Sequence, residues 1–265
     1  MKTISKYSAI KISEHILHKI EEYLVVEESL LININGNPFT LTMRSPGFEK
    51  ELTIGLLFTE KIIEKNTPYE YFVVEKRNGI ITAVNVLIDK VYLKKELLDK
   101  RNLLSVSSCG ICGKTELNDQ LDCQNPIESK LQITATQLLL FFDIMKKNQV
   151  LFSNTSGCHA AALMDVEGNL IAIMEDIGRH NAVDKVIGDT IIRGIEKNDL
   201  ILLVSGRVSY EIVTKSYIAG FPILAAISAP SSLAVDLSAD MGITLLGFCR
   251  ENRVTCYTHN ERIII

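Results

Sequence analysis

The chain has 265 residues, of which 47% are hydrophobic and 23% charged, a composition typical of a soluble globular protein. Its 28 Lys and Arg residues against 32 Asp and Glu residues give a net charge of -4, which argues against a mainly electrostatic nucleic-acid binder. No apolar run reaches the ~18 residues of a membrane span, and residues 1–6 do not resemble a signal peptide. We therefore expect a cytoplasmic protein with no nucleic-acid or membrane partner. In that reducing compartment its six cysteines are expected to be metal ligands, reactive thiols or core residues.

Two β-hairpins are predicted in the first third of the chain, because an Asn-Gly pair that tolerates the positive φ angles of a tight turn separates two apolar runs. The strands are 29–34 and 38–43 around Asn35-Gly36, then 69–76 and 80–88 around Asn78-Gly79. Between the hairpins we expect a helix from about Pro46 to Glu64, with Ser45 as its cap and Pro46 at its first position. Its predicted core stripe is Phe48, Leu52, Leu56 and Ile63.

Residues 89–131 are rich in Lys, Asp, Asn and Ser and are predicted to be mostly loop, with short helical pieces. A loop of this length is more often functional or mobile than passive. A helix over about 135–147 follows, and Thr134 and Gln137 have the spacing of a capping box.

From residue 160 onward, short apolar strands alternate with helices, which predicts an α/β sheet buried on both faces. Ligands in such sheets bind at the carboxyl edge of the strands, so we expect a pocket there. The predicted strands are 160–165, 170–175, 200–204, 223–227, 243–248 and about 254–258, and the predicted helices are 181–195, 209–219 and 231–241.

The octamer SSCGICGK at 107–114 carries two thiols three positions apart, with a glycine after each. Small neighbours leave the sulfur atoms accessible, and Lys114 favours the thiolate, which is the nucleophilic form. Three interpretations remain open from the motif alone: a zinc site, a thioredoxin-like dithiol and a mobile sulfur carrier. Zinc needs four ligands, and no second C-x-x-C pair is present; the other candidates are Cys123, Cys158, His159, Cys249 and Cys256. The dithiol interpretation is weakened because residues 103–108 make a poor strand and Gly113 a poor helix start.

Polar clusters lie where predicted strands meet turns. One, at 155–162, precedes a strand, and the others, at 175–185, 205–211 and 247–253, lie at strand ends. Glycine permits close backbone approach, and a helix start offers free N–H groups to an anion. The arginines of these clusters are expected to form a fork for phosphate: Arg179, Arg207, Arg250 and Arg253. The alternative is that they pair with nearby acids: Glu175, Asp176, Glu211 and Glu251. Four arginines at successive strand ends favour a pocket for a phosphorylated ligand.

Four other side chains in these regions have a simple structural alternative. His159 and His180 can each be held by hydrogen bonds to the backbone. Cys249 and Cys256 lie in or beside apolar strands and are interpreted as small core residues.

Taken together, these motifs resemble the formate dehydrogenase accessory protein family, a family of accessory sulfurtransferases. The resemblance covers roughly residues 22–260. The matching stretches are SSCGICGK at 107–114, SGCHAAAL at 156–163, EDIGRHNAVDKVIG at 175–188, SGRVSYEIVTKSYIAGFPILAAISAPSSLAVDLSA at 205–239 and GFCR at 247–250.

The resemblance implies a function in sulfur transfer. Such proteins take persulfide sulfur from a cysteine desulfurase onto the C-x-x-C loop. They pass it to the molybdenum bis-guanine dinucleotide cofactor, which is their bound substrate, before this cofactor enters the catalytic subunit of formate dehydrogenase. On this chain Cys109 would carry the persulfide, with Cys112 as the second thiol. The guanine dinucleotide site would include Phe248, Cys249, Arg250, Glu251, Asn252 and Arg253, and we add to it Arg179, His180, Gly206 and Arg207.

The resemblance also implies a homodimer and an α/β, cytidine deaminase-like three-layer sandwich with an additional N-terminal β-rich lobe. We place that lobe at 1–131, with the C-x-x-C loop at 105–115, and the α/β core at 132–265. Zinc deaminases use an H-x-E triplet followed by P-C-x-x-C. This chain has Ala161 where the catalytic glutamate would be, and its cysteine pair precedes His159. Deaminase activity, a catalytic zinc and a structural metal are therefore not expected.

Two alternatives to sulfur transfer remain. The first is a chaperone that binds the molybdenum cofactor without a covalent step, and the second is a zinc-stabilised nucleotide-binding protein.

Overall fold

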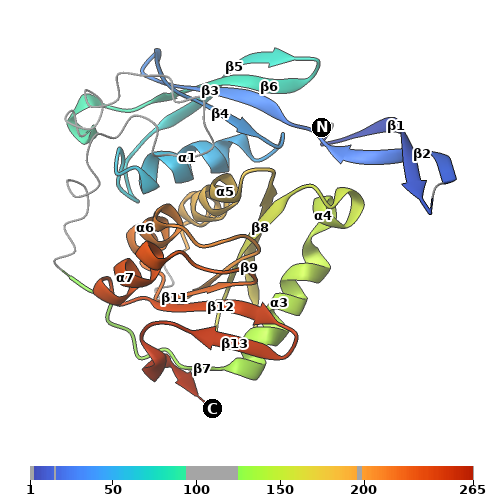
Figure 1. The fold of residues 1–265 in the computed structure, drawn as a ribbon. Helices are drawn as coiled ribbons and strands as arrows, with labels where there is room; N and C mark the ends of the chain where they lie inside the picture. Colours follow the sequence, from blue (N-terminus) through green and yellow to red (C-terminus); the bar gives the residue numbers. More distant parts are fainter. Residues whose placement is uncertain (1–2, 15, 94–124, 196–198, 265) are drawn as a thin grey trace.

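A computed structural model describes residues 3–14, 16–93, 125–195 and 199–264. Its central element is a six-stranded sheet in the order β13-β12-β11-β10-β8-β9 (Figure 1). The strands are β8 (His159–Met164), β9 (Leu170–Asp176), β10 (Ile201–Val204), β11 (Ile223–Ala226), β12 (Thr244–Arg250) and β13 (Arg253–Cys256). Every residue of β10 and β11 is buried, as their uninterrupted apolar sequences predict.

Helices cover both faces of this sheet, so the predicted α/β class is confirmed. On one face lie α5 (Arg179–Ile192), α6 (Tyr210–Ala219) and α7 (Ser232–Asp240), which share a hydrophobic core with the strands. On the other face lies α3 (Ala135–Asn148), whose Leu138, Phe141 and Met145 pack in a second core. The predicted capping box at the start of α3 is present, because Thr134 Oγ1 accepts from Gln137 N and the Gln137 side chain accepts from Thr134 N.

The N-terminal part forms a separate four-stranded sheet in the order β4-β3-β6-β5. Its strands are β3 (Glu28–Ile34), β4 (Asn37–Arg44), β5 (Glu70–Arg77) and β6 (Ile80–Leu87). The two predicted Asn-Gly hairpin turns are confirmed, since all four turn residues have positive φ. Helix α1 (Glu49–Thr59) packs against this sheet through a third core that contains Leu30, Leu52 and Val84.

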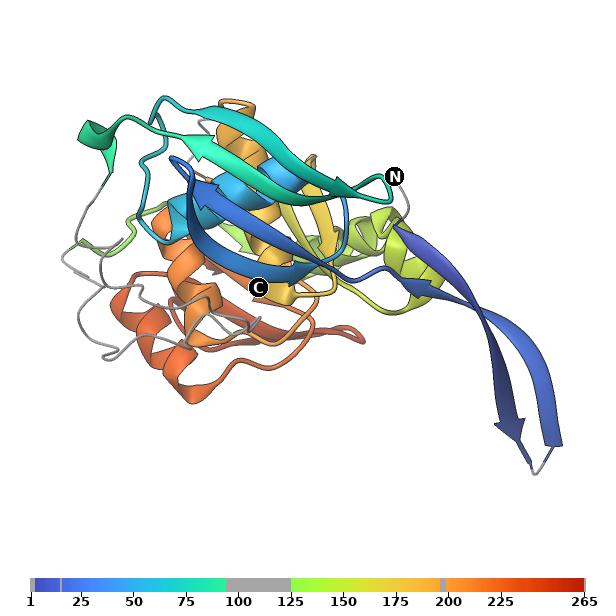
Figure 2. The ribbon, with the colours of Figure 1, turned by 90° about the horizontal axis from the view of Figure 1, so that it is seen from above.

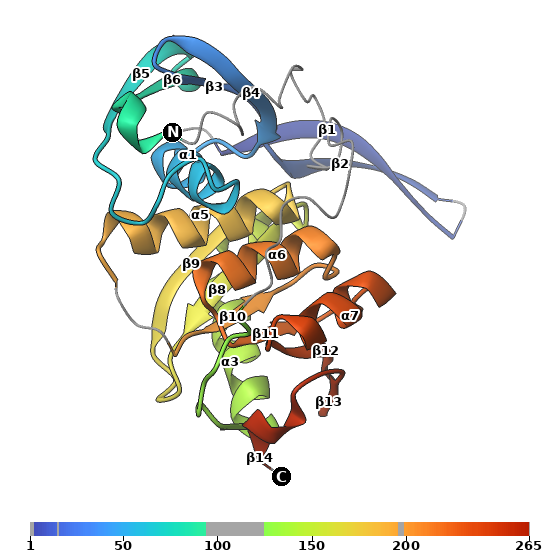
Figure 3. The same cartoon turned by 90° about the vertical axis from the view of Figure 1, so that its left-hand side faces the viewer.

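Helix α1 also packs against α5, so it joins the two sheets (Figure 3). The two helix backbones touch at Gly55 and Gly188. A Cβ atom added to Gly55 would lie 1.8 Å from the carbonyl oxygen of Asp184, and one added to Gly188 would lie 1.9 Å from that of Glu51. Only glycine fits at these two positions, because any side chain would push the helices apart.

The start of α1 differs from the prediction. The helix begins at Glu49 rather than at Pro46, and its N-cap is Phe48, in the left-handed conformation with φ 58°. Ser45 does not cap it: its hydroxyl accepts a hydrogen bond from Ile177 N, 132 residues away in the sequence. Phe48 is 55% exposed and therefore is not a core residue, whereas Ile63 is buried but lies beyond the end of the helix.

A long hairpin at the N-terminus was not predicted. Strands β1 (Ile4–Ser13) and β2 (Ile16–Val25) pair antiparallel and project from the body of the molecule as an arm (Figure 2). The arm contacts the body near α4 (Val150–Thr155), a short helix that was also not predicted. Residues of the arm are mostly exposed, including Ile10, Ile12 and Leu17.

The remaining elements are short. They are the 3-10 turns η1 (Lys90–Tyr92) and η2 (Asn260–Arg262) and the parallel pair β7 (Ile133–Thr134) and β14 (Ile263–Ile264). Among the described residues, no helix is long and apolar enough to cross a membrane. The proposed division of the chain at residues 131 and 132 stays a prediction.

Candidate functional site

The polar clusters predicted from the sequence meet at one edge of the six-stranded sheet. Strands β10, β11 and β12 are parallel, β8 runs antiparallel to β10, and β9 runs antiparallel to β8. The carboxyl ends of β9, β10, β11 and β12 therefore lie at the same edge as the start of β8. This is the edge at which ligands bind in open α/β sheets.

His159, Arg179 and Gly206 are in direct proximity at this edge. A Cβ atom added to Gly206 would lie 3.3 Å from His159 Nδ1 and 3.4 Å from Arg179 Cβ, so the glycine allows both side chains to approach the backbone. Ser205 is part of the same group: its Oγ accepts from Ala160 N at 2.9 Å and lies 3.5 Å from His159 Nδ1. We call His159, Arg179, Ser205, Gly206 and Arg207 the edge cluster.

The edge cluster is electropositive. Burial lowers the pKa of His159, and the positive charges of Arg179, His180 and Arg207 lower it further, against the opposing effect of Asp176. Arg179 Nε is buried and has no hydrogen-bond partner. A buried donor of this kind is costly to leave unsatisfied, so it is well placed to bind an anion.

Two of the acids that the alternative interpretation assigned to these arginines, Glu175 and Asp176, have other partners. Glu175 accepts from the backbone N–H groups of Leu151 and Phe152 at 2.7 and 2.8 Å, at the start of α4. Asp176 binds Lys185 Nζ at 2.7 Å. Among the described residues, no ion pair joins Arg179 to either acid.

His180 lies at the start of α5 and connects that helix to α6. Its Nε2 is 2.8 Å from Glu211 Oε2 and 3.2 Å from Ser209 Oγ. The side chain is buried and bonded to side chains, so backbone hydrogen bonds alone do not explain its position. It holds the start of α5 against α6 beside the edge cluster.

The predicted nucleotide stretch at 248–253 forms the β12–β13 hairpin, in which Arg250 pairs with Arg253. Glu251 and Asn252 make its turn with positive φ angles. The Arg253 guanidinium lies 5.2 Å from the centre of the Phe248 ring, which is a cation–π contact. The Phe248 N–H donates to Ser228 O, which ties the hairpin to the turn after β11.

Cys249 points away from this hairpin surface. It is 1% exposed and packs in the core beside α3, and burial raises the pKa of its thiol to about 12. Its interpretation as a small core residue is confirmed, so its side chain is not a ligand-binding group. Cys256 is partly buried and packs against the same core.

The structure brings the four predicted arginines to the same edge in two groups. Arg179 and Arg207 belong to the edge cluster, whereas Arg250 and Arg253 lie on the hairpin. Among the described residues, no hydrogen bond or ion pair joins the two groups. The sequence analysis placed Ser205 in the polar cluster at 205–211 but assigned it no role; its position directly after an apolar strand was the available signal.

Cys109 and Cys112, together with the predicted loop at 105–115, lie outside the described residues. Cys158 is described: it is buried, and its Sγ lies 3.4 Å from Glu175 Oε1. Burial, followed by the neighbouring carboxylate, raises the pKa of this thiol to about 12, so it is a poor nucleophile. Within the described part of the chain, no group of three His, Cys, Asp or Glu side chains is placed to hold a metal ion.

The fold and the site together define a class of protein: an α/β protein with a cluster of cationic side chains at the carboxyl edge of its central sheet. A family model described as the FdhD/NarQ family matches residues 25–264, so the chain belongs to this family. The resemblance inferred from the sequence motifs is thereby confirmed.

Two relatives and one solved structure illustrate the similarity. "Sulfur carrier protein FdhD" of Picrophilus torridus is 42% identical over 251 residues, which cover 92% of this chain and 93% of that protein. The protein of the same name from Streptomyces coelicolor is 38% identical over 275 residues, covering 97% and 94%. A crystal structure of a formate dehydrogenase accessory protein from Desulfotalea psychrophila matches with a TM-score of 0.78 at 24% identity, over 99% of this chain and 100% of that one. This last match shows the shared fold.

Proposed function

We propose that this protein is a sulfur carrier, a sulfurtransferase that takes persulfide sulfur from a cysteine desulfurase and passes it to the molybdenum bis-guanine dinucleotide cofactor for maturation of formate dehydrogenase. Membership of the FdhD/NarQ family supports the sulfur-carrier part, since relatives that match over most of their length are named sulfur carrier proteins. The cofactor is a substrate here, and its phosphates require a cationic site.

The covalent step is a thiolate displacement on a persulfide. The Cys109 thiolate attacks the outer sulfur of the persulfide on the desulfurase, a new S–S bond forms on Cys109, and the bond to the donor cysteine breaks. The donor cysteine leaves as a thiolate, so no external oxidant or reductant is consumed. Cys112 is the second thiol of the motif. In the proposed release step its thiolate attacks Cys109 Sγ, the Cys109–Cys112 disulfide forms, and the outer sulfur leaves as hydrosulfide for the cofactor, so the thiol pair supplies the two electrons.

One observation carries the proposal for the second substrate: Arg179 Nε is buried without a partner, while the nearby Asp176 and Glu175 are bound by other groups. Helix α5 begins at this edge directly after Gly178, and α6 begins after Ser209, so the positive ends of both helix dipoles lie in the same region. These residues fit a diphosphate group. We assign it to Arg179, Arg207 and the start of α5.

We assign the guanine end of the same substrate to the β12–β13 hairpin. The exposed Arg253 and the partly exposed Phe248 already form a stacked pair there, and a planar base can use either surface. In this proposal Arg250 supplies further positive charge, and His180 positions the start of α5 through its contacts with Glu211 and Ser209.

We further propose that the core has the cytidine deaminase arrangement and that the protein works in the cytoplasm as a homodimer. Deaminase chemistry is not part of the proposal, because the position of the catalytic glutamate is occupied by Ala161, which is fully buried in β8.

The test is intact mass spectrometry after incubation with a cysteine desulfurase and cysteine, combined with a formate dehydrogenase maturation assay. We expect the natural chain to gain the mass of one sulfur atom and the Cys109→Ala variant to gain none and to fail in maturation. Cys123→Ala is the matched control, since it removes a thiol from the same polar segment outside the motif, and it should behave as the natural chain.

The outcomes separate the candidate functions. Loss of the sulfur adduct with full maturation would favour the cofactor chaperone without a covalent step. An adduct and full maturation in Cys109→Ala would show that this cysteine is not the carrier.

A further inference from the structure

The β1–β2 arm exposes an open strand edge. Neither β1 nor β2 pairs with any other strand in the described part of the chain. Large apolar side chains are exposed along the arm: Tyr7, Ile10, Ile12, Ile16, Leu17, Tyr23 and Leu24. An isolated two-stranded ribbon is marginally stable in water, and three or more strands are needed for independent stability. The arm thus has the properties of a surface that is completed by another strand.

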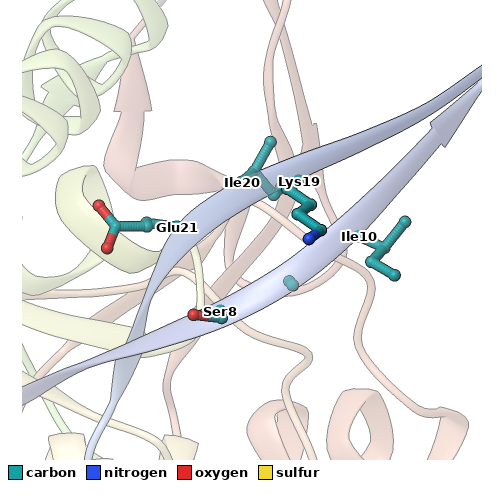
Figure 4. Close-up of a pocket in the computed structure, with 6 residues that line it drawn as sticks. Ser8, Ile10, Lys19, Ile20 and Glu21 are labelled. Atoms are coloured by element: carbon teal, nitrogen blue, oxygen red, sulfur yellow. The ribbon is translucent and has the colours of Figure 1, made fainter.

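The sequence of β2 is symmetric in chemical character. Residues 16–24 read Ile-Leu-His-Lys-Ile-Glu-Glu-Tyr-Leu, so two apolar residues and two basic residues precede Ile20, and two acidic residues and two apolar residues follow it. Figure 4 shows Lys19, Ile20 and Glu21 at the middle of the arm, beside Ser8 and Ile10 of β1. Lys19 and Glu21 lie on one face of the ribbon, and their neighbours His18 and Glu22 lie on the other.

This symmetry makes the outer edge of β2 complementary to a second copy of itself. When two β2 strands pair antiparallel about Ile20, Lys19 lies opposite the partner's Glu21, and His18 lies opposite the partner's Glu22. Leu17 then faces the partner's Tyr23. Residues directly opposite in an antiparallel pair share a face and touch, so opposite charges attract and apolar residues bury each other.

The outer edge of β1 lacks this property. Its charged residues are Lys6 and Lys11, which a two-fold antiparallel pairing about the centre of β1, between Ser8 and Ala9, would place opposite each other. Like charges directly opposite are destabilising. Charged residues on an edge strand commonly prevent pairing with another strand. The two lysines of β1 oppose its pairing with a second β1, whereas the opposite charges of β2 favour its pairing with a second β2.

We infer that two copies of this chain associate through the outer edges of their β2 strands, in a two-fold antiparallel pairing centred on Ile20 that forms a four-stranded ribbon. The inference rests on the homodimer of the proposed function and specifies its surface. An isologous contact of this kind is closed, because each strand uses its single open edge, so it gives a dimer and not a fibre. Every ion pair of the interface occurs twice.

The experiment measures the dimer dissociation constant by sedimentation equilibrium for three variants of the full chain: Lys19→Glu, Glu21→Lys and the double variant. Each single change turns two attractive pairs into two repulsive pairs, so we expect the dissociation constant to rise about 10- to 100-fold. The double variant restores opposite charges across the interface and should return to within a few fold of the natural chain.

Mixing gives the sharpest result. Each single variant repels itself, but Glu at position 19 of one variant faces Lys at position 21 of the other, and the remaining natural pair stays attractive. The two weakened variants should therefore form a heterodimer when mixed.

Lys11→Glu is the matched control: it reverses the charge of an exposed lysine on β1 and should leave the dissociation constant unchanged. Lys19→Glu is the cleaner single change, since Glu21 also binds Lys6 within the arm at 2.5 Å.

The inference is overturned if the natural chain is monomeric, if the charge reversals leave a dimer intact, or if the mixed variants stay apart. It is also overturned if the reversals weaken binding of the desulfurase while self-association is unchanged, because the arm would then be a docking site for that enzyme. Persulfide loading, measured on the same samples, tests sulfur transfer separately: failed loading with normal self-association counts against the proposed function and not against this surface.

Discussion

The buried cations and the edge cations of this protein come from the same two helical regions but have opposite surroundings. Lys185 of α5 and Lys215 of α6 are buried, and each binds a carboxylate at 2.7 Å, Asp176 and Asp184 respectively. Arg179 also belongs to α5, yet its buried Nε has no partner. A buried charge needs a partner. Lys185 and Lys215 have theirs within the folded chain, whereas Arg179 is suited to an external anion.

The largest expected effect comes from breaking a buried pair. Lys215→Met leaves the Asp184 carboxylate buried with Thr59 Oγ1 as its remaining side-chain partner at 2.8 Å. We expect the free energy of unfolding to fall by about 3–5 kcal/mol, measured by urea denaturation. The control is Lys215→Met combined with Asp184→Leu, which removes both charges and should recover most of the loss. If the double variant is no more stable than the single one, the contribution of Lys215 to the free energy of unfolding does not come from its ion pair with Asp184.

A smaller and opposite effect is expected at the edge. Arg179→Met removes an unsatisfied buried donor, so the free energy of unfolding should stay the same or rise by about 1 kcal/mol. Binding of guanosine diphosphate, measured by calorimetry at fixed salt, should weaken about 10-fold or more because a charge-assisted contact is lost. Arg193→Met is the matched control, since Arg193 follows α5 and binds Asp189 at its far end. Equal affinity in both variants would remove Arg179 from the ligand site.

The smallest effect concerns the titration of His159. Because burial and the neighbouring cations disfavour its charged form, the pKa of His159 is expected below the ordinary value of about 6.5. Arg179→Met should raise this pKa toward the ordinary value, as seen by NMR titration, while Arg193→Met should not. Because the pKa of His159 is lower in the folded chain than in the unfolded chain, its contribution to stability is fully present when the pH is above the ordinary pKa. This contribution is lost as the pH falls toward the folded-state pKa. An unchanged pKa in Arg179→Met would mean that the guanidinium does not act on the imidazole.

Local sequence signals predicted most of the fold. The Asn35-Gly36 turn and the Thr134 capping box each depend on residues within four positions, and both are present. The buried strands β10 and β11 followed from their apolar sequences. The start of α1 could not be predicted in this way, because Ser45 is diverted to Ile177 by tertiary contact.

For the site, the sequence predicted which strand ends carry arginines, and sheet topology explains why they share one edge. The sequence did not predict which of the nearby acids form ion pairs with other residues instead of with those arginines. Asp176 is adjacent in sequence to the motif of Arg179, yet it is bound by Lys185, one helical turn and a half farther along α5. The arm was missed because its strands mix apolar and charged residues on both faces, so no single face has the alternation of a half-buried strand.

The contact between Ser45 and the turn after β9 ties the chemistry of the sheet edge to the N-terminal half. Ser45 N donates to Asp176 Oδ2 at 3.1 Å, and Ser45 Oγ accepts from Ile177 N at 3.0 Å, so a loop of one half shapes the turn that presents Arg179. Hybrid chains that recombine the halves of two family members will retain a correctly presented arginine only when both sides of this contact are inherited from the same parent.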